Sequence, residues 1–326
     1  MLLERRELSD QQMRLVIHDL MGGCCGDAET AALLIALRMK GESAKELAAA
    51  AAVLRENMIR FETGRADVLD TCGIGGDGTG TFNISTAAAF VAAGAGVVVV
   101  KHGNRAVSSC SGSADVLAAL GVVLKEDLTW AQRCLSQAGL AFCFAPHFHP
   151  ALRHVAPIRR RLGLRTLFNC LGPLANPAGA QYQLLGVGRP ELLDPLAGAL
   201  ALLGTRHAFV VCGKDGLDEV SLSDSTLVRE VRGSRVFVAE WSPRDFGLAP
   251  VALAELQVSG PEESAAVIRA ILDGVEGPAA RVATANAAAA LVAAEKVDSL
   301  AEGAACAHQA IQSGKARQVL ERLIVC

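Results

Sequence analysis

A cluster of glycines near residue 75 follows a short apolar segment and limits what this part of the chain can form. Five glycines lie within eight residues, from Gly73 to Gly80. Glycine reaches left-handed backbone conformations without steric cost, and its backbone N–H groups can approach an anion closely. We expect residues 67–70 to form a strand that ends in this loop and residues 86–93 to form the next helix. The alternative is a tight turn, which would not need so many conformationally costly glycines.

The loop also contains the G-x-G-x-x-G spacing of dinucleotide-binding sites, at Gly73, Gly75 and Gly78. That fingerprint requires an acidic residue about 20 residues further on, at the end of the next strand, to bind a ribose hydroxyl. Here the next apolar strand, expected at residues 97–100, is followed by a lysine and a histidine. A cation in that position argues against a nicotinamide cofactor and suits phosphate.

Polar residues suited to phosphate lie on both sides of this strand. Asn83, Ser85 and Thr86 are expected at a helix N-terminus, where backbone amides and the helix dipole favour phosphate oxygens. Residues 101–113 add cations, an amide and several hydroxyls at the carboxyl end of a strand. Open α/β sheets bind their ligands at that edge. A solvated polar loop is the alternative for the second segment.

Two further clusters carry weaker signals. Asp218 and Glu219 follow a strand expected at residues 208–212, and adjacent carboxylates can hold Mg²⁺ together with waters and phosphates. In an exposed loop they would equally be ordinary surface charges. His147 and His149 have H-x-H spacing, but no carboxylate lies nearby in the sequence, which disfavours a metal. Nearby arginines would mostly form a solvated helix face, although one could bind a carboxylate or phosphate.

The order of helices and strands predicts an α/β fold. Ser9, Asp27 and Ser43 would cap three helices in the N-terminal segment. Beyond them, apolar strands alternate with helices, which is typical of a mostly parallel sheet flanked by helices. Further strands are expected at 122–124 and 142–144, and further helices at 113–120, 129–137, 265–272 and 283–295. We expect a small helical domain (residues 1–66, with part of 160–185 packed against it) and an α/β domain (residues 67–326).

Composition excludes some classes of function. The 326 residues are enough for two domains. A net charge of −3 and 4% aromatic residues give no sign of a nucleic-acid or anionic-membrane partner. The ten cysteines contain no C-x-x-C pair, which favours a reducing compartment. No targeting segment or apolar run of ~20 residues is present. We therefore expect a cytoplasmic protein.

Several motifs in order make the chain resemble the anthranilate phosphoribosyltransferase family. They are A-L-R-M-K-G-E at residues 36–42, T-F-N-I-S-T at 81–86, K-H-G-N-R at 101–105, A-P-I-R at 156–159, F-N-C-L-G-P-L-A-N-P at 168–177 and D-G-L-D-E at 215–219. The resemblance extends from about residue 9 to about residue 295. K-H-G-N-R together with D-E is specific, whereas the glycine loop also occurs in pyrimidine nucleoside phosphorylases. Ile74, Cys110 and Cys212 depart from the family's usual residues.

The resemblance implies a nucleoside phosphorylase-like fold with substrates between the two domains, and a homodimer joined through the helical domain. It implies that phosphoribosyl pyrophosphate binds Gly73, Gly76, Asp77, Thr81, Asn83, Ile84, Ser85, Thr86, Lys101, His102, Gly103, Asn104, Arg105, Ala106, Val107, Ser108, Ser109 and Ser113. Anthranilate would contact Gly73, Asn104 and Arg159. Mg²⁺ would be held through Ser85, Asp218 and Glu219.

The implied reaction is a pentosyl transfer in tryptophan biosynthesis. The anthranilate amine would displace pyrophosphate from C1 of the ribose and give N-(5-phosphoribosyl)anthranilate. An aromatic amine carries no proton that must be removed before attack, so no general acid or base is expected and positioning would supply most of the rate. The alternatives are a pyrimidine nucleoside phosphorylase-like enzyme and a non-catalytic relative that binds nucleic acid.

Overall fold

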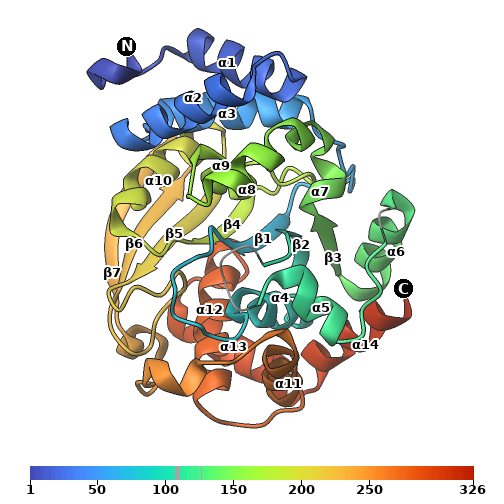
Figure 1. Cartoon of the computed structure of the whole chain (residues 1–326). Helices are drawn as coiled ribbons and strands as arrows, with labels where there is room; N and C mark the ends of the chain where they lie inside the picture. Colours follow the sequence, from blue (N-terminus) through green and yellow to red (C-terminus); the bar gives the residue numbers. More distant parts are fainter. Residues whose placement is uncertain (107–110, 126) are drawn as a thin grey trace.

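The computed structural model describes residues 1–106, 111–125 and 127–326. Its centre is a sheet of seven strands within these residues, in the order β3-β2-β1-β4-β5-β6-β7 (Figure 1). The strands are β1 (Val68–Gly73), β2 (Val98–Gly103), β3 (Leu140–Phe144), β4 (Tyr182–Gly186), β5 (His207–Gly213), β6 (Thr226–Arg232) and β7 (Arg235–Trp241). β1 to β5 pair in parallel, whereas β6 and β7 add an antiparallel hairpin at one edge.

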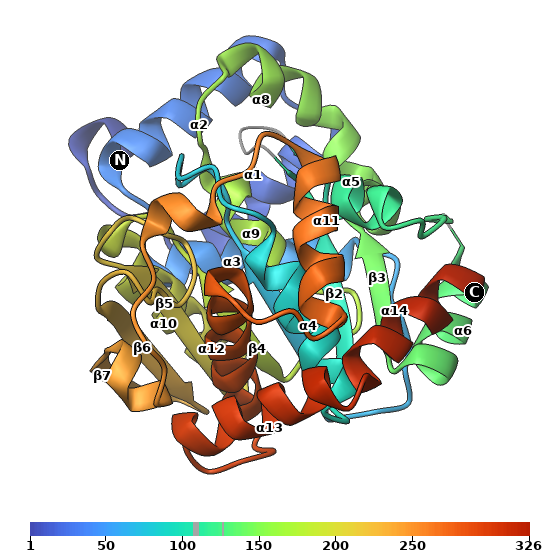
Figure 2. The same cartoon turned by 90° about the horizontal axis from the view of Figure 1, so that it is seen from below.

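One face of the sheet is covered by helices from the middle and end of the chain (Figure 2). The buried helices α4 and α12 pack against each other there. Both contact β1; α4 also contacts β2, and α12 also contacts β4. The helices of this layer are α4 (Ile84–Gly94), α5 (Ser113–Ala119), α6 (Leu128–Ala138), α11 (Pro261–Leu272), α12 (Pro278–Ala293), α13 (Leu300–Gln312) and α14 (Lys315–Val325).

The N-terminal helices lie over the opposite face, together with helices from the middle of the chain (Figure 1). α3 contacts α9 and α10, and α2 contacts α8. The elements of this layer are α1 (Asp10–Gly22), α2 (Asp27–Lys40), α3 (Ala44–Glu56), α7 (Ala145–Phe148), α8 (Ala156–Leu162), α9 (Leu167–Leu174) and α10 (Leu193–Leu202). Short 3₁₀ segments complete the fold at Leu2–Glu4, Pro150–His154, Pro190–Leu192, Pro243–Phe246 and Leu253–Leu256.

Alternation along the strands explains why the sheet has two apolar faces. Phe209 and Val211 pack into the core beside α4 and α12, whereas Val210 and Cys212 pack into the core beside α3 and α10. Successive side chains of a strand point to opposite faces, so a continuous apolar run serves both cores. The predicted fold class, an α/β sheet flanked by helices with a helical N-terminal segment, is confirmed.

The helix starts show which local predictions were correct. Ser9 and Ser43 both cap their helices in capping boxes, with Gln12 and Glu46 as the third helical residues. The prediction that Asp27 caps its helix was wrong, because Gly26 occupies the N-cap position of α2. Asp27 lies in the first turn, where its negative charge interacts favourably with the helix dipole.

Other predictions failed because the formation and length of a strand depend on the strands that pair with it. Residues 122–124 form no strand: Val122 is buried in the core and Leu124 packs partly against it, but Val123 is 66% exposed and no neighbouring strand among the described residues pairs with the three residues. β2 continues beyond residue 100 to Gly103, so Lys101 and His102 belong to the strand. β4, the β6–β7 hairpin, α13 and α14 were not predicted.

In the described part of the chain, no helix is long and apolar enough to cross a membrane.

Candidate active site

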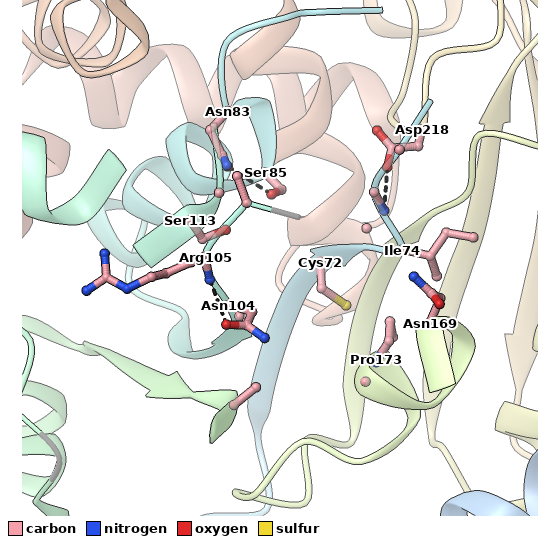
Figure 3. Close-up of a pocket in the computed structure, with 18 of the residues that line it drawn as sticks. Cys72, Ile74, Asn83, Ser85, Asn104, Arg105, Ser113, Asn169, Pro173 and Asp218 are labelled. Carbon is pink, nitrogen blue, oxygen red and sulfur yellow. Dashed lines mark hydrogen bonds between the residues drawn. The ribbon is translucent and has the colours of Figure 1, made fainter. Parts of the chain in front are cut away.

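A cavity of about 430 Å³ opens where β1 and β2 end and α4 begins. It lies between the glycine loop, the end of β2, the start of α5, α9 and the segment that follows β5 (Figure 3). Carboxyl ends of parallel strands are the usual ligand-binding edge of such sheets. Its walls include most of the predicted site residues: Gly73, Gly76, Asp77, Thr81, Asn83, Ile84, Ser85, Lys101, His102, Gly103, Asn104, Arg105, Ala106, Ser113, Arg159, Asp218 and Glu219.

The glycine loop needs its glycines for conformation. Gly75, Gly76, Gly78 and Gly80 have φ values of 66°, 69°, 78° and 71°. Residues with a Cβ rarely adopt these values. The loop therefore holds a backbone path that other residues would strain, with amide groups beside the cavity.

The N-terminus of α4 faces the same cavity. Asn83 caps the helix, because its Oδ1 accepts a hydrogen bond from the Thr86 amide at 3.0 Å. Its Nδ2 donates to the carbonyl oxygen of Ser111 at 3.0 Å, which ties the segment before α5 to the helix start. Thr86 itself does not line the cavity, and its Oγ1 is buried without a hydrogen-bond partner among the described residues.

Lys101 is a buried cation at the floor of the site. It is 2% exposed, and its Nζ donates to Ser85 Oγ at 2.9 Å and to the carbonyl oxygen of Thr71. Desolvation lowers the pKa of Lys101, although neighbouring carboxylates oppose this shift. Burial raises the pKa of Asp70 to about 6 against the opposing effect of Lys101. Asp70 accepts hydrogen bonds from the His102 amide and Asn176 Nδ2.

Asp218 and Glu219 face the cavity as a crowded acidic pair. Asp218 Oδ2 accepts a hydrogen bond from the Gly75 amide at 3.0 Å (Figure 3). Burial and then the charge of Asp77 raise the pKa of Asp218 to about 7. Burial and then the charge of Asp218 raise the pKa of Glu219 well above its usual range. Glu219 is 7% exposed, which disfavours the alternative of ordinary surface charges in an exposed loop.

The close approach of this acidic segment depends on two strand-end glycines. A Cβ at Gly186, the last residue of β4, would lie 1.6 Å from the Asp218 carbonyl oxygen. A Cβ at Gly73, the last residue of β1, would lie 2.9 Å from Asp218 Oδ2. Larger residues at either position would push the carboxylates away from the sheet edge.

Arg159 lies on the opposite wall of the cavity, on α8. Its guanidinium stacks over the Phe168 ring at 5.4 Å, and its Nη2 donates to Asn169 Oδ1 at 3.5 Å. Burial lowers the pKa of Arg159. No carboxylate is paired with this arginine among the described residues, so its charge is available to an anion in the cavity.

Two buried histidines lie between these walls. The rings of His102 and His149 are 4.9 Å apart, and His102 Nδ1 lies 2.9 Å from the Gly172 carbonyl oxygen. Desolvation lowers the pKa of His102 to about 3 and that of His149 to about 4, so both rings are neutral near pH 7. Neutral imidazoles add polar groups to the site without adding charge.

Some site residues lay beyond the predictions. His149, Asn169, Gly172 and Pro173 line the cavity but received no role from the sequence. The F-N-C-L-G-P motif was a usable signal for the last three, because α9 carries it to the cavity wall. Val107, Ser108, Ser109 and Cys110 lie outside the described residues.

The donor set suits a hard divalent cation better than a soft one. Asp218, Glu219 and Ser85 offer oxygen atoms, which Mg²⁺ prefers. Burial and then like charge raise the pKa of both carboxyl groups, so their ionised forms lack a counter-charge that a bound cation would supply. In the described ranges, no group of three or more His, Cys, Asp and Glu side chains is placed to hold a metal by itself. Mg²⁺ commonly completes its shell with waters and substrate phosphates.

Comparisons with known proteins define the class: a glycosyl transferase with two recognisable parts. The helical bundle domain of a glycosyl transferase family matches residues 1–58, and the α/β domain of such a family matches residues 65–317. The chain is 54% identical over 310 residues to anthranilate phosphoribosyltransferase from Thermomicrobium roseum, covering 94% of this chain and 89% of that protein.

Solved structures agree with the sequence comparison. The anthranilate phosphoribosyltransferase from Thermus thermophilus superposes with a TM-score of 0.93 at 44% identity, covering 99% of this chain and 97% of that one. The Saccharomyces cerevisiae enzyme in complex with phosphoribosyl pyrophosphate and Mg superposes with a TM-score of 0.88 at 31% identity, covering 98% and 93%. The chain belongs to the anthranilate phosphoribosyltransferase family, as its motifs indicated.

Proposed function

We propose that this enzyme transfers the phosphoribosyl group from phosphoribosyl pyrophosphate to the amine of anthranilate. The C1–O bond to pyrophosphate breaks, the C1–N bond forms, and the amine, once attached to C1, releases one proton to the solvent. The observation that carries the proposal is the convergence of three groups on one cavity: the glycine loop, the acidic pair and the unpaired Arg159. Family membership and the similarity to the yeast enzyme with its named ligands support the same reaction.

The loop side of the cavity would hold phosphoribosyl pyrophosphate. The glycine-loop amides and the N-terminus of α4 supply N–H donors, and Lys101 with Ser85 supplies a buried cation and hydroxyl. Donors fixed before the reaction stabilise charge that develops on the leaving pyrophosphate without reorganising. Asn83 would contribute by capping α4 and fixing its start, since its Oδ1 accepts from the Thr86 amide and its backbone N–H donates to Ser264 Oγ at 2.9 Å.

Mg²⁺ would bind through Ser85, Asp218 and Glu219 and neutralise charge on the pyrophosphate. The acidic pair without enough counter-charge fits a divalent cation. Here Lys101 adds a further positive charge, and the Gly75 amide keeps Asp218 beside the glycine loop.

The α8–α9 wall would hold anthranilate. Arg159 is oriented by Asn169 and Phe168 and suits the planar carboxylate of this substrate. Asn104 and Gly73 line the same cavity. The neutral histidines offer no charged acid or base near pH 7, which suits a reaction whose rate comes from positioning.

The assay follows loss of anthranilate fluorescence with protein, Mg²⁺ and phosphoribosyl pyrophosphate, with each component omitted in turn. Loss that requires all components, with release of one pyrophosphate per anthranilate consumed, supports the proposal. Phosphorolysis of uridine or thymidine without anthranilate turnover would favour the phosphorylase alternative. A gel shift with nucleic acid at physiological salt and no turnover would favour the binding protein.

We also propose that the enzyme is a cytoplasmic homodimer joined through its helical N-terminal region. Three apolar side chains of this region are exposed, and a second copy would cover them: Leu3 at 93%, Leu15 at 62% and Met39 at 72%. Light scattering should give twice the 33.9 kDa chain mass, and Leu15→Glu with Met39→Glu should give the single mass.

The proposed cytoplasmic location is supported by the cysteines. In the described part of the chain nine cysteines are free, which suits a reducing compartment. Cell fractionation tests the location.

A further inference from the structure

Arg165 is a charged residue that contacts the glycine loop from outside the cavity. It lies in the linker between α8 and α9, and its Nη2 donates to the carbonyl oxygen of Ile74 at 3.1 Å and to that of Gly75. Arg165 does not line the cavity itself. Any effect it has on a ligand must therefore act through the loop.

Both the carbonyl oxygen and the amide of Gly75 are held by hydrogen bonds to side chains. Its carbonyl oxygen accepts from Arg165, and its amide donates to Asp218. The preceding amide, that of Ile74, donates to the Gly186 carbonyl oxygen at 3.0 Å. These contacts fix the peptide groups at the start of the loop, just where φ first becomes positive.

The same arginine links the loop to the N-terminal helices. Arg38, on α2, donates from Nη1 to the Arg165 carbonyl oxygen at 2.5 Å. Arg165 Nη1 is buried and has no hydrogen-bond partner among the described residues. A buried donor without an acceptor costs free energy, so the position is poorly explained by fold stability alone.

We propose that Arg165 is a positioning residue, which holds the glycine loop in its phosphate-binding conformation and couples the loop to α2. The inference rests on the proposed function, because it assigns the loop to phosphoribosyl pyrophosphate. One nitrogen, Nη2, donates to both adjacent carbonyl oxygens, and the rigid guanidinium plane fixes its direction. Lys would keep the charge, but its flexible ammonium has no such plane. The positioning role therefore depends on both the charge and the planar shape of the Arg165 guanidinium.

The kinetic test compares Arg165→Ala and Arg165→Lys with a matched control, Arg161→Ala. Arg161 also joins this segment to α2, through Asp27 at 3.0 Å, but both side chains are more than 70% exposed and neither touches the loop. Arg165→Ala should raise the KM for phosphoribosyl pyrophosphate on the order of ten- to a hundredfold. The KM for anthranilate should change by less than about threefold, and Arg161→Ala should behave as wild type. Arg165→Lys should lie between, and guanidinium ion should partly rescue Arg165→Ala.

A second readout needs no turnover. Amide hydrogen exchange in residues 73–80 should be faster in both Arg165 variants than in Arg161→Ala, while exchange in α12 stays unchanged. An unchanged KM for phosphoribosyl pyrophosphate, or equal shifts in both KM values with unchanged loop exchange, would overturn the proposal. If Arg165→Ala does not fold, Arg165→Lys and the exchange data decide. Absence of activity in wild type would contradict the proposed function, and the exchange comparison would still test the contact.

Discussion

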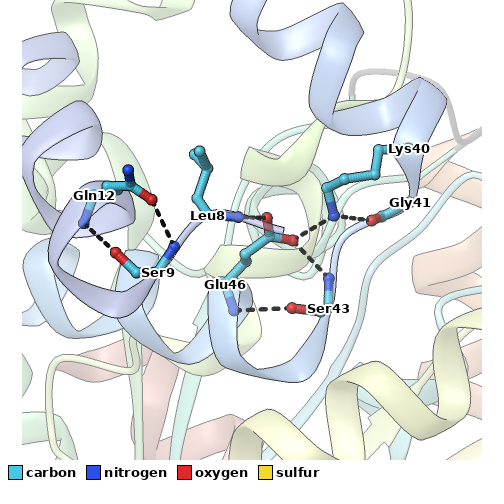
Figure 4. A network of polar contacts seen from close by, with 7 residues as sticks. All are labelled: Leu8, Ser9, Gln12, Lys40, Gly41, Ser43 and Glu46. Carbon is cyan, nitrogen blue, oxygen red and sulfur yellow. Dashed lines mark hydrogen bonds and ion pairs between the residues drawn. The ribbon is translucent and has the colours of Figure 1, made fainter. Parts of the chain in front are cut away.

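Two groups of buried carboxylates in this molecule have opposite surroundings: one is paired with a cation and hydrogen-bonded, and the other lies among further carboxylates. Glu46, in the N-terminal helices, accepts hydrogen bonds from Lys40 Nζ at 2.6 Å and from the amides of Ser43 and Leu8 at 3.0 and 2.9 Å (Figure 4). Asp218 and Glu219, in the cavity, lie beside each other and near a third carboxylate, Asp77.

The pKa shifts follow from this contrast. Burial acts to raise the pKa of Glu46, but the hydrogen bonds from Lys40, Ser43 and Leu8 outweigh it and lower the pKa. In the cavity, burial and like charges act together and raise the pKa of Asp218 to about 7. A buried carboxylate whose hydrogen bonds and counter-charge come from the protein stabilises the folded state. A buried carboxylate without enough counter-charge is instead a candidate binding site for a cation.

The largest effect is expected from neutralising the cavity pair. Asp218→Asn with Glu219→Gln should lower kcat on the order of a thousandfold, because stabilisation of the leaving group by a cation is worth several kcal/mol. The Mg²⁺ concentration for half-maximal rate should rise. Steady-state kinetics over a Mg²⁺ titration measures both, and an unchanged titration would exclude the pair as the cation site.

Removing the charge of Glu46 should instead affect stability. Glu46→Gln leaves Lys40, whose side chain is 5% exposed, without its partner, and should lower the unfolding free energy by ~3–5 kcal/mol. Both KM values should stay within about twofold of wild type where the variant is folded. Denaturant titration tests this against Glu56→Gln, an exposed partner of Arg14 that should cost under ~0.5 kcal/mol. A comparable loss in both variants would show that the buried network contributes nothing special.

The pH dependence of the Glu46 contribution has a definite sign. Because its pKa is lowered in the folded state, its stabilisation is present at neutral pH and is lost as the pH falls below ~4. The stability difference between wild type and Glu46→Gln should therefore shrink toward acid pH.

Arg159 tests whether the opposite wall serves the second substrate. Arg159→Ala should raise the anthranilate KM by about one to two orders of magnitude, since a charge-assisted hydrogen bond contributes roughly 1.5–3 kcal/mol. The KM for phosphoribosyl pyrophosphate should move far less. The exposed neighbour Arg160, changed to Ala, serves as control. Equal shifts in both KM values would assign Arg159 to structure or to phosphate.

Ile74 should show the smallest effect. Anion binding by the loop depends mainly on backbone N–H groups, and a neutral hydroxyl contributes only ~1 kcal/mol. Ile74→Thr should therefore change kcat/KM for phosphoribosyl pyrophosphate by less than about tenfold. A larger gain would mean that side-chain contacts matter more at this position.

Much of the fold and of the candidate site could be predicted from local signals in the sequence. Ser9 and Ser43 with their third-position partners start helices because capping involves only neighbouring residues. The glycine loop was recognisable for the same reason. What failed depends on distant partners. A short apolar run such as residues 122–124 becomes a strand only beside another strand. The β6–β7 hairpin is an exception, because its strands pair locally across the two residues Gly233 and Ser234, and this local signal was missed.

The site shows the same limit. Nothing near Asp218 in the sequence indicates that strand-end glycines 186 and 73 bring it against the glycine loop, so its burial could not be anticipated. Arg165 lies 90 residues from the Gly75 carbonyl it holds. The chemical types of the site residues were predictable from motifs, whereas their electrostatic environment required the fold.

The contrast between the two carboxylate groups is tested most directly by thermal unfolding of Asp218→Asn with Glu219→Gln in the presence of a chelator. Raised carboxyl pKa values mean that the folded protein binds more protons than the unfolded chain between pH ~4 and 7, so stability falls as pH rises through this window. The variant should melt about 2 °C or more above wild type at pH 7.5, and this gain should shrink at pH 5. A variant that melts below wild type at pH 7.5, as Glu46→Gln should, would contradict the account.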